Sequence, residues 1–187
     1  LLDLVLASPE PHAVIAAKTV QHHWDVADPV LNVVTSPIEQ QEEKIEVKVP
    51  ANFSKAEAEV YRLGSEVFHR EAHCVTCHQP NGKGLDPAFP PIESSPWVAE
   101  DVERLIKITL YGLMGPIEVA GKKYDGQVPM TPFGGMLKDD EIAAVLTFVR
   151  NSFGNRADPV TAAQVKAVRD QQPGRLMLYT TDELLKE

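Results

Sequence analysis

The stretch Cys74-Val75-Thr76-Cys77-His78 carries the strongest signal in this chain. It contains the only two cysteines of the 187 residues, three positions apart, with a histidine directly after the second. On a tight helical turn, thiols at this spacing can reach the two vinyl groups on one edge of a porphyrin, and the next imidazole then lies beside the iron. The pattern predicts that Cys74 and Cys77 bind one haem c covalently and that His78 is a ligand of its iron.

Other interpretations of the cysteine pair explain less of the pattern. A structural zinc site needs four ligands, and the chain has only these two cysteines. A disulfide between them would close a small, strained loop that adds little stability. A thioredoxin-like redox pair would need a strand–helix–strand context that the sequence lacks, and it would leave the histidine unexplained.

The residues before this stretch predict an amphipathic helix that leads directly into it. Ser54 followed by Glu57 has the spacing of a capping box, in which each side chain bonds a backbone N–H at the start of a helix. Apolar residues then recur on one face, so we expect the helix to run from Lys55 to about Ala72.

The residues after the stretch predict a loop, two further helices and a hairpin. Two glycines and five prolines between 79 and 96 argue against regular structure there. An apolar stripe predicts a helix over 98–111, and Gly121 marks the turn of a hairpin within 115–127. A third helix is expected over 139–151, with acidic residues in its first turn, where the helix dipole favours them.

The second iron ligand must come from a segment that can fold over the opposite face of the haem. Met130 is the leading candidate, because Pro129 and Pro132 flank it and stiffen the loop that carries it. Met136 and Met114 are the alternatives. A thioether ligand stabilises ferrous iron, which predicts a relatively high reduction potential suited to electron transfer.

Residues 54–155 resemble the class I cytochrome c family. Gly64 and Phe68 stand ten and six residues ahead of the first cysteine, like the pair in that family's first helix, where the small glycine lets the last helix cross closely. Phe148, in AVLTFVRN, resembles the aromatic residue that packs against this first helix at the crossing. The segment MTPFGGMLKDDEIAAVLTFVRNSFGN resembles the ligand-methionine loop and final helix of cytochrome c domains fused to larger bacterial proteins, with Lys138 where a serine cap is usual.

The same resemblance assigns two further residues to the haem pocket. FPPIESSPWV is similar to the family segment whose proline carbonyl orients the proximal imidazole. This implies that role for Pro90, with Pro91 as the alternative register. Trp97 resembles an aromatic residue packed beside the haem edge, and ordinary core packing is the competing explanation.

The predicted fold is all-α: a cytochrome c fold with three or four core helices around one covalent haem, extended by helices at both ends. Residues 54–155 would form the class I cytochrome c domain, after an acidic linker or extended arm at 36–53. Residues 1–35 contain a predicted helix at 10–24. They resemble part of the HEAT-like region that precedes such domains in large dehydrogenase-like proteins of planctomycetes and their relatives, and would be a remnant of such a region. Residues 156–187 would add a helical C-terminal extension.

These features predict a monohaem c-type cytochrome that passes single electrons from a dehydrogenase, fused to it or separate, to a downstream carrier or oxidase. With both axial positions of the iron filled, the domain would have no catalytic activity of its own. Two alternatives stay open, a haem peroxidase and a sensor of diatomic gases. Each of them needs Met130 to be displaced from the iron.

Composition limits the partners and the location. A net charge of -9 and the lack of a basic stripe argue against nucleic acid as a partner. No apolar run approaches the roughly 18 residues needed to span a bilayer. Covalent haem implies assembly outside the cytoplasm in bacteria, which predicts a periplasmic location. Residues 1–8 lack an initiator Met and a basic region, so we expect a processed or excised chain rather than an intact signal peptide.

Overall fold

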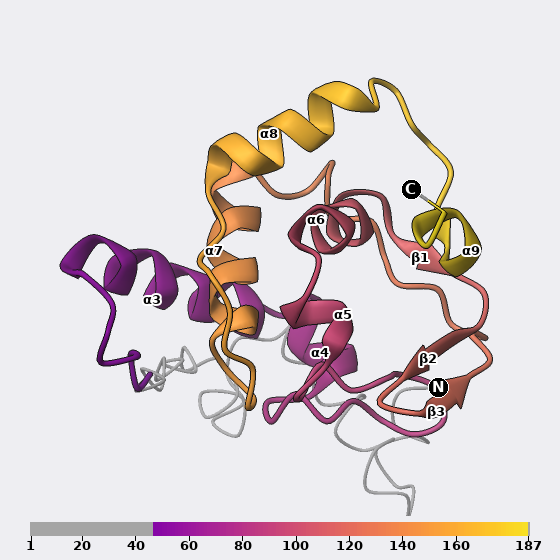
Figure 1. Ribbon diagram of the computed structural model, residues 1–187, viewed down its shortest axis with the longest axis horizontal. Helices are drawn as coiled ribbons and strands as arrows, with labels where there is room; N and C mark the ends of the chain where they lie inside the picture. Colours follow the sequence, from indigo (N-terminus) through magenta and orange to yellow (C-terminus); the bar gives the residue numbers. More distant parts are fainter. Residues whose placement is uncertain (1–46, 187) are drawn as a thin grey trace, which may run out of the picture. The chain divides into compact units, whose positions relative to one another are not determined.

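The computed structural model describes residues 47–186, where helices are the main secondary structure (Figure 1). The predicted helix at 10–24 and most of the predicted arm before residue 54 lie outside these residues. Residues 47–53 contain neither helix nor strand. In chain order the elements are α3 (Lys55–His69), α4 (Cys74–His78), α5 (Pro96–Ala99), α6 (Val102–Tyr111), β1 (Leu113–Met114), β2 (Ile117–Val119), β3 (Lys122–Tyr124), α7 (Asp139–Arg150), α8 (Ala162–Gln171), β4 (Tyr179–Thr180) and α9 (Thr181–Leu184).

The capping box at the start of α3 is confirmed. The backbone N–H of Glu57 donates to the Ser54 hydroxyl at 3.3 Å, and the N–H of Ser54 donates to the Glu57 carboxylate at 2.7 Å. The prediction that this helix continues to Ala72 is wrong, because α3 ends at His69. Arg70 leaves the helical conformation with a ψ of 144°, and Ala72, with a left-handed φ of 58°, lies in the turn that leads into α4.

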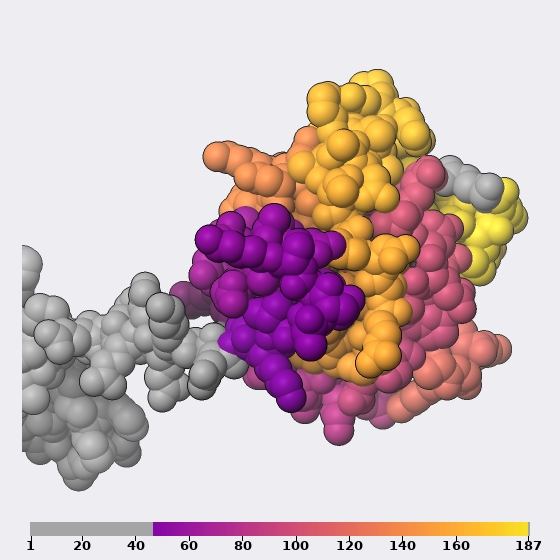
Figure 2. Space-filling model, turned by 60° about the vertical axis from the view of Figure 1, so that its left-hand side comes forward, coloured from indigo at the N-terminus to yellow at the C-terminus, as the bar shows by residue number. Residues whose placement is uncertain are grey.

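The core of the fold is the crossing of α3 with α7. A Cβ atom built on Gly64 would collide with the carbonyl oxygen of Ala144 and come within 2.8 Å of the Phe148 Cβ. Only a glycine therefore allows this approach. The rings of Phe68 and Phe148 lie 5.5 Å apart within the contact, and Figure 2 shows the surface of α3, in indigo, directly beside that of α7, in orange.

The predicted continuous helix over 98–111 is wrong in one respect, since the structure has two helices there. α5 begins with Pro96 at its first position, and Asp101 then has the extended backbone of an N-cap, with φ -101° and ψ 108°. The Asp101 carboxylate accepts the backbone N–H of Arg104 at 3.0 Å, which starts α6 as a new helix. Gly112, with φ 78°, ends α6.

Two small sheets complete the described part. The predicted hairpin is present: β2 and β3 pair antiparallel, and Gly121 lies in the turn between them with φ 78°. A parallel pair of β1 with β4, in the register Leu113 to Tyr179, was not predicted. Strands of two residues carry no alternation that a sequence pattern could reveal.

The helix predicted over 139–151 is α7, which begins at Asp139. At its start the backbone N–H of Lys138 donates to the Glu141 carboxylate at 3.1 Å. The chain then folds back, and α8 packs against α7 and α6 (Figure 1). Val165 and Val168 of α8 are buried in the same apolar core.

Candidate functional site

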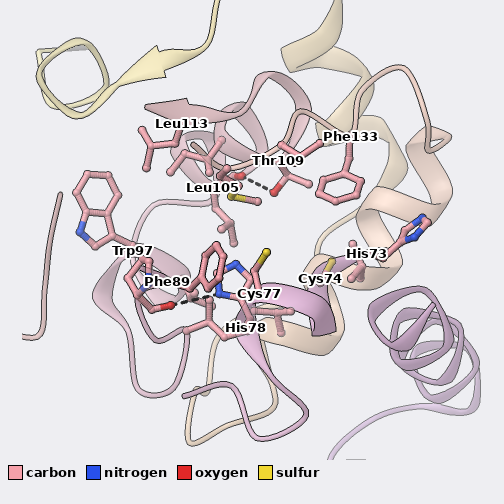
Figure 3. A pocket seen from close by; sticks show the side chains of 18 of the residues that line it. His73, Cys74, Cys77, His78, Phe89, Trp97, Leu105, Thr109, Leu113 and Phe133 are labelled. Carbon is pink, nitrogen blue, oxygen red and sulfur yellow. Dashed lines mark hydrogen bonds between the residues drawn. The ribbon is translucent and has the colours of Figure 1, made fainter. Parts of the chain in front are cut away.

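One apolar cavity of about 360 Å³ lies beside α4 (Figure 3). Its walls come from α4, the loop at 89–92, α5, α6, the segment 128–133 and α7. The structure brings every site residue predicted from the sequence to this cavity, namely Cys74, Cys77, His78, Pro90, Trp97 and Met130.

The two cysteines lie on α4 and present their sulfur atoms to the cavity (Figure 3). Both are free thiols, so the structure contains no disulfide between them. Burial raises the pKa of Cys74 to about 11 and also raises the pKa of Cys77. Before a haem is attached, burial thus favours the protonated thiol at both positions, as is typical of thiols held against an apolar wall.

His78 has a defined proton arrangement. Its Nδ1 lies 3.3 Å from the carbonyl oxygen of Pro90, and because a carbonyl can only accept, Nδ1 donates the hydrogen bond. Burial lowers the pKa of His78, and the bond to Pro90 acts in the opposite direction. The ring is thus neutral, with Nε2 left as a lone-pair donor for a metal, and its orientation is set by the backbone of the proline.

Met130 lies on the wall that faces these groups. Its backbone exchanges two hydrogen bonds with Leu113: the Met130 N–H donates at 2.8 Å and the Leu113 N–H donates back at 3.4 Å. Leu113 lies across the cavity from His78 and Cys77 in Figure 3. The other two methionines considered, Met136 and Met114, are 56% and 41% exposed and do not line the cavity.

Trp97 forms one edge of the cavity. Its indole N–H donates to the carbonyl oxygen of Glu118 in β2 at 2.8 Å, and the Arg104 guanidinium lies 4.6 Å from the centre of its ring. The tryptophan thereby fixes the β2–β3 hairpin against α5, and Ile117 and Val119 of that hairpin become part of the cavity wall.

Several wall residues were not identified from the sequence. Leu105 and Thr109 of α6 line the cavity, yet the apolar stripe that contains them only indicated a buried helix face. Ile108, outside that stripe, lines the cavity as well. A stripe that faces a cofactor and one that faces a protein core have the same period. The hairpin residues Ile117 and Val119 gave no signal, because their position depends on the contact between Trp97 and Glu118.

The residues of the cavity fit a haem better than a bare metal ion. Among residues 47–186 no group of three or more His, Cys, Asp or Glu side chains could hold an ion. The cavity instead combines two free thiols, the neutral imidazole of His78 and one thioether with a largely apolar wall, which also includes His73. Soft, uncharged donors of this kind suit haem iron, and the thiols suit covalent attachment.

Comparison with known proteins agrees with this chemistry. The cytochrome c family model matches residues 61–153. Over 117 residues the chain is 44% identical to cytochrome c-552 of Thermus thermophilus. This match covers 57% of this chain and 83% of that protein. The chain belongs to the cytochrome c family, whose members carry covalently bound haem c with its iron and work in electron transfer.

More distant relatives belong to a larger complex. The chain is 33% identical over 110 residues to the cytochrome c subunit of a quinone alcohol dehydrogenase from Gluconacetobacter polyoxogenes, and 31% identical over 109 residues to that of Gluconobacter oxydans. Each match covers 57% of this chain but only 22% of the relative. No helix within residues 47–186 is both long and apolar enough to cross a membrane.

Proposed function

We propose that this chain is a monohaem c-type cytochrome that transfers single electrons, with its haem bound to Cys74 and Cys77 and its iron ligated by His78 and Met130. The observation that carries the proposal is that His78 and Met130 line the same cavity from facing walls, next to two free thiols. They reach it from segments 52 positions apart in the sequence. We place this function in residues 54–155, as a compact domain with three or four core helices.

Each residue has a separate task in this proposal. The haem iron supplies a one-electron couple between its ferric and ferrous states. Cys74 and Cys77 keep the cofactor attached, and Pro90 holds the imidazole of His78 in one tautomer and one orientation. Met130 would hold the iron through its thioether sulfur and so keep substrate and water away from it. A haem held by two protein side chains in this way would supply one-electron transfer rather than catalysis.

The environment of the site also bears on the reduction potential. A thioether ligand and an apolar wall both favour the less charged ferrous state, so we expect a relatively high potential. Trp97 and the hairpin shield one edge of the cavity from water. The domain is then an acceptor for the electrons of a reducing enzyme.

A dehydrogenase is the electron donor that we propose, fused to this chain or separate from it, with a soluble carrier or an oxidase as acceptor. The support is the similarity to cytochrome c subunits of alcohol dehydrogenases. Covalent haem attachment supports an extracytoplasmic location, the periplasm in a bacterium. Purified dehydrogenase should reduce the cytochrome at a rate that falls with salt if the docking is electrostatic.

The ligand assignment is tested by spectroscopy on the ferric holoprotein. Wild-type protein should have the long-wavelength charge-transfer band of a methionine–iron bond, and Met130→Ala should lose it. Met136→Ala is the matched control, because this exposed methionine lies six positions further along the chain and outside the cavity. Loss of the band in the control alone would show that Met136 is the ligand. A high-spin wild-type spectrum would instead favour a peroxidase or a gas sensor.

A further inference from the structure

The segment after the family match packs onto the loop that carries Met130. We define the C-terminal strap as residues 162–184, which comprise α8, β4 and α9 and lie beyond the matched range 61–153. In Figure 1 the strap runs from α7 over α6 to β1. The strap therefore contacts the loop that follows Met130 and also β1, which pairs with Met130.

The first contact is made by one arginine of α8. Arg169 donates from Nη1 to the carbonyl oxygen of Gly134 at 2.6 Å and from Nη2 to that of Leu137 at 3.4 Å. Its Nε donates to the Asp139 carboxylate at 2.8 Å. One guanidinium thus joins two carbonyls of the loop between Met130 and α7 to the first residue of α7, using the fixed fork of donors that only arginine has.

The second contact is made by β4. The backbone of Leu113 pairs with Met130 on one side and with Tyr179 on the other. Leu113 therefore connects the backbone of Met130 to β4 of the strap. Tyr179 is fully buried and packs with Ile108, while Met130 packs against the same cluster. The methionine is held here through β1 rather than directly.

Gly112 shows how closely these parts are stacked. A Cβ atom on this glycine would lie 2.5 Å from the Leu178 side chain and 2.5 Å from the carbonyl oxygen of Met130. The residue before β4 and the backbone of the methionine therefore enclose Gly112 together. The backbone N–H of Tyr179 also donates to the Gly112 carbonyl at 3.1 Å.

We infer that the C-terminal strap is a positioning device for the second iron ligand, and that Arg169 is its main positioning residue. This inference rests on the proposed ligation by Met130. Arg169 does not touch the cavity. It fixes the carbonyl oxygens of the loop at 134 and 137, which reduces the fraction of molecules in which the loop swings away and leaves the iron position open.

The test measures that open fraction with imidazole as the probe, added to the ferric holoprotein. An external ligand binds only when the methionine has left, so its apparent affinity rises in proportion to the open fraction. Arg169→Gln removes charge-assisted hydrogen bonds, and we expect imidazole to bind roughly 10- to 100-fold more tightly, with a weaker methionine charge-transfer band. Arg169→Lys keeps a cation beside Asp139 and should give an intermediate affinity; it also serves if the glutamine variant fails to fold.

Two variants on the same helix are matched controls. Val168→Ala removes buried core volume but none of the hydrogen bonds that Arg169 makes to the loop, so it should lower stability and leave the imidazole affinity unchanged. Lys166→Ala removes an exposed ion pair with Asp170 and should change neither quantity. If Arg169→Gln behaves like Val168→Ala, losing stability with no change in imidazole affinity, Arg169 is merely structural and the inference is wrong.

The Met130→Ala variant separates this inference from the proposed function. If its spectrum equals that of wild type, Met130 is not the ligand and the proposed ligation is wrong. If Met130→Ala loses the band while the Arg169 variants keep wild-type imidazole affinity, the ligation is correct and only the positioning role of the strap is overturned.

Discussion

Gly64 of α3 lies directly against the carbonyl of Ala144 in α7, with no room for a side chain between them. Replacing Gly64 with Ala should lower the free energy of unfolding by about 2 kcal/mol or more, since a methyl group forced against backbone cannot relax as it would against a flexible side chain. The gain of roughly 1 kcal/mol in helix propensity is too small to offset this. Denaturant unfolding of the holoprotein measures the change.

Gly135→Ala is the control for that experiment. A Cβ atom there would meet no atom within 4 Å, so stability should change by no more than about 0.5 kcal/mol. Equal effects of the two substitutions would show that the close crossing of α3 and α7 is not what requires glycine at position 64.

A second prediction concerns pH. The Arg70 guanidinium donates to the Glu141 carboxylate at 2.6 Å, and this bond, followed by the one from the Lys138 N–H, lowers the pKa of Glu141. A carboxyl whose folded-state pKa is lowered stabilises the fold above its unfolded pKa of about 4.3, and that contribution disappears as the pH falls through the folded value. Glu141→Gln should therefore cost up to about 1 kcal/mol at pH 7, where the half-exposed pair is screened by solvent.

The difference between wild type and Glu141→Gln should shrink as the pH is lowered below about 4, because both side chains are then neutral. Denaturant unfolding at a series of pH values gives the curve. The exposed Glu66 of α3 provides Glu66→Gln as a control. A constant difference across the whole pH range would rule out the ion pair as its cause.

A third prediction concerns cofactor attachment. Cys74→Ala should leave haem bound through Cys77 alone, so the denatured chain keeps one haem mass. Its reduced pyridine complex should absorb at longer wavelength than that of wild type, because one vinyl group stays conjugated with the porphyrin. Acid extraction should remove all haem from the Cys74→Ala, Cys77→Ala double variant. A single variant with the wild-type wavelength would contradict attachment at both sulfurs.

The fourth prediction concerns Asn155, which ties the loop after Pro90 to α7. Its side chain accepts the Ser95 N–H at 3.0 Å and donates to the carbonyl oxygens of Ile92 at 2.8 Å and Val149 at 3.0 Å. Asn155→Ala leaves the Ser95 N–H and the Ile92 carbonyl without this partner and should cost about 2–3 kcal/mol of unfolding free energy.

Asn151→Ala serves as the comparison for this variant, because Asn151 makes one side-chain bond, to the Thr147 carbonyl at 3.1 Å. Its expected cost is about 1 kcal/mol. Should Asn155→Ala prove no more damaging than Asn151→Ala, the loop at 92–95 is held by something other than this side chain.

Local signals were enough to predict much of the site. The spacing of Cys74, Cys77 and His78 is short-range chemistry, and the structure places all three on one small helix that faces one cavity. The prolines around Met130 pointed to a stiff loop, and that loop does line the cavity. The carbonyl of Pro90 was implied only by resemblance, since no pattern in the sequence indicates which backbone oxygen an imidazole will meet.

One local helix break and two contacts between residues distant in sequence were missed. The apolar stripe predicted one continuous helix over 98–111. The Asp101 carboxylate instead caps the start of a second helix, so the structure has a break there. The pairing of Leu113 with Tyr179 joins residues 66 positions apart, and the fork of Arg169 reads as an ordinary exposed charge on a helix. Neither has a local period that could reveal it.

The parallel pairing of β1 with β4 also bears on the order in which the molecule assembles. A loop of this length must be closed against chain entropy, so we expect the pair to form after the local helices, once the final residues of the strap are available. Until then the wall carrying Leu113 and Met130 lacks its outer support. That wall would thus gain its final support only when β4 pairs with β1.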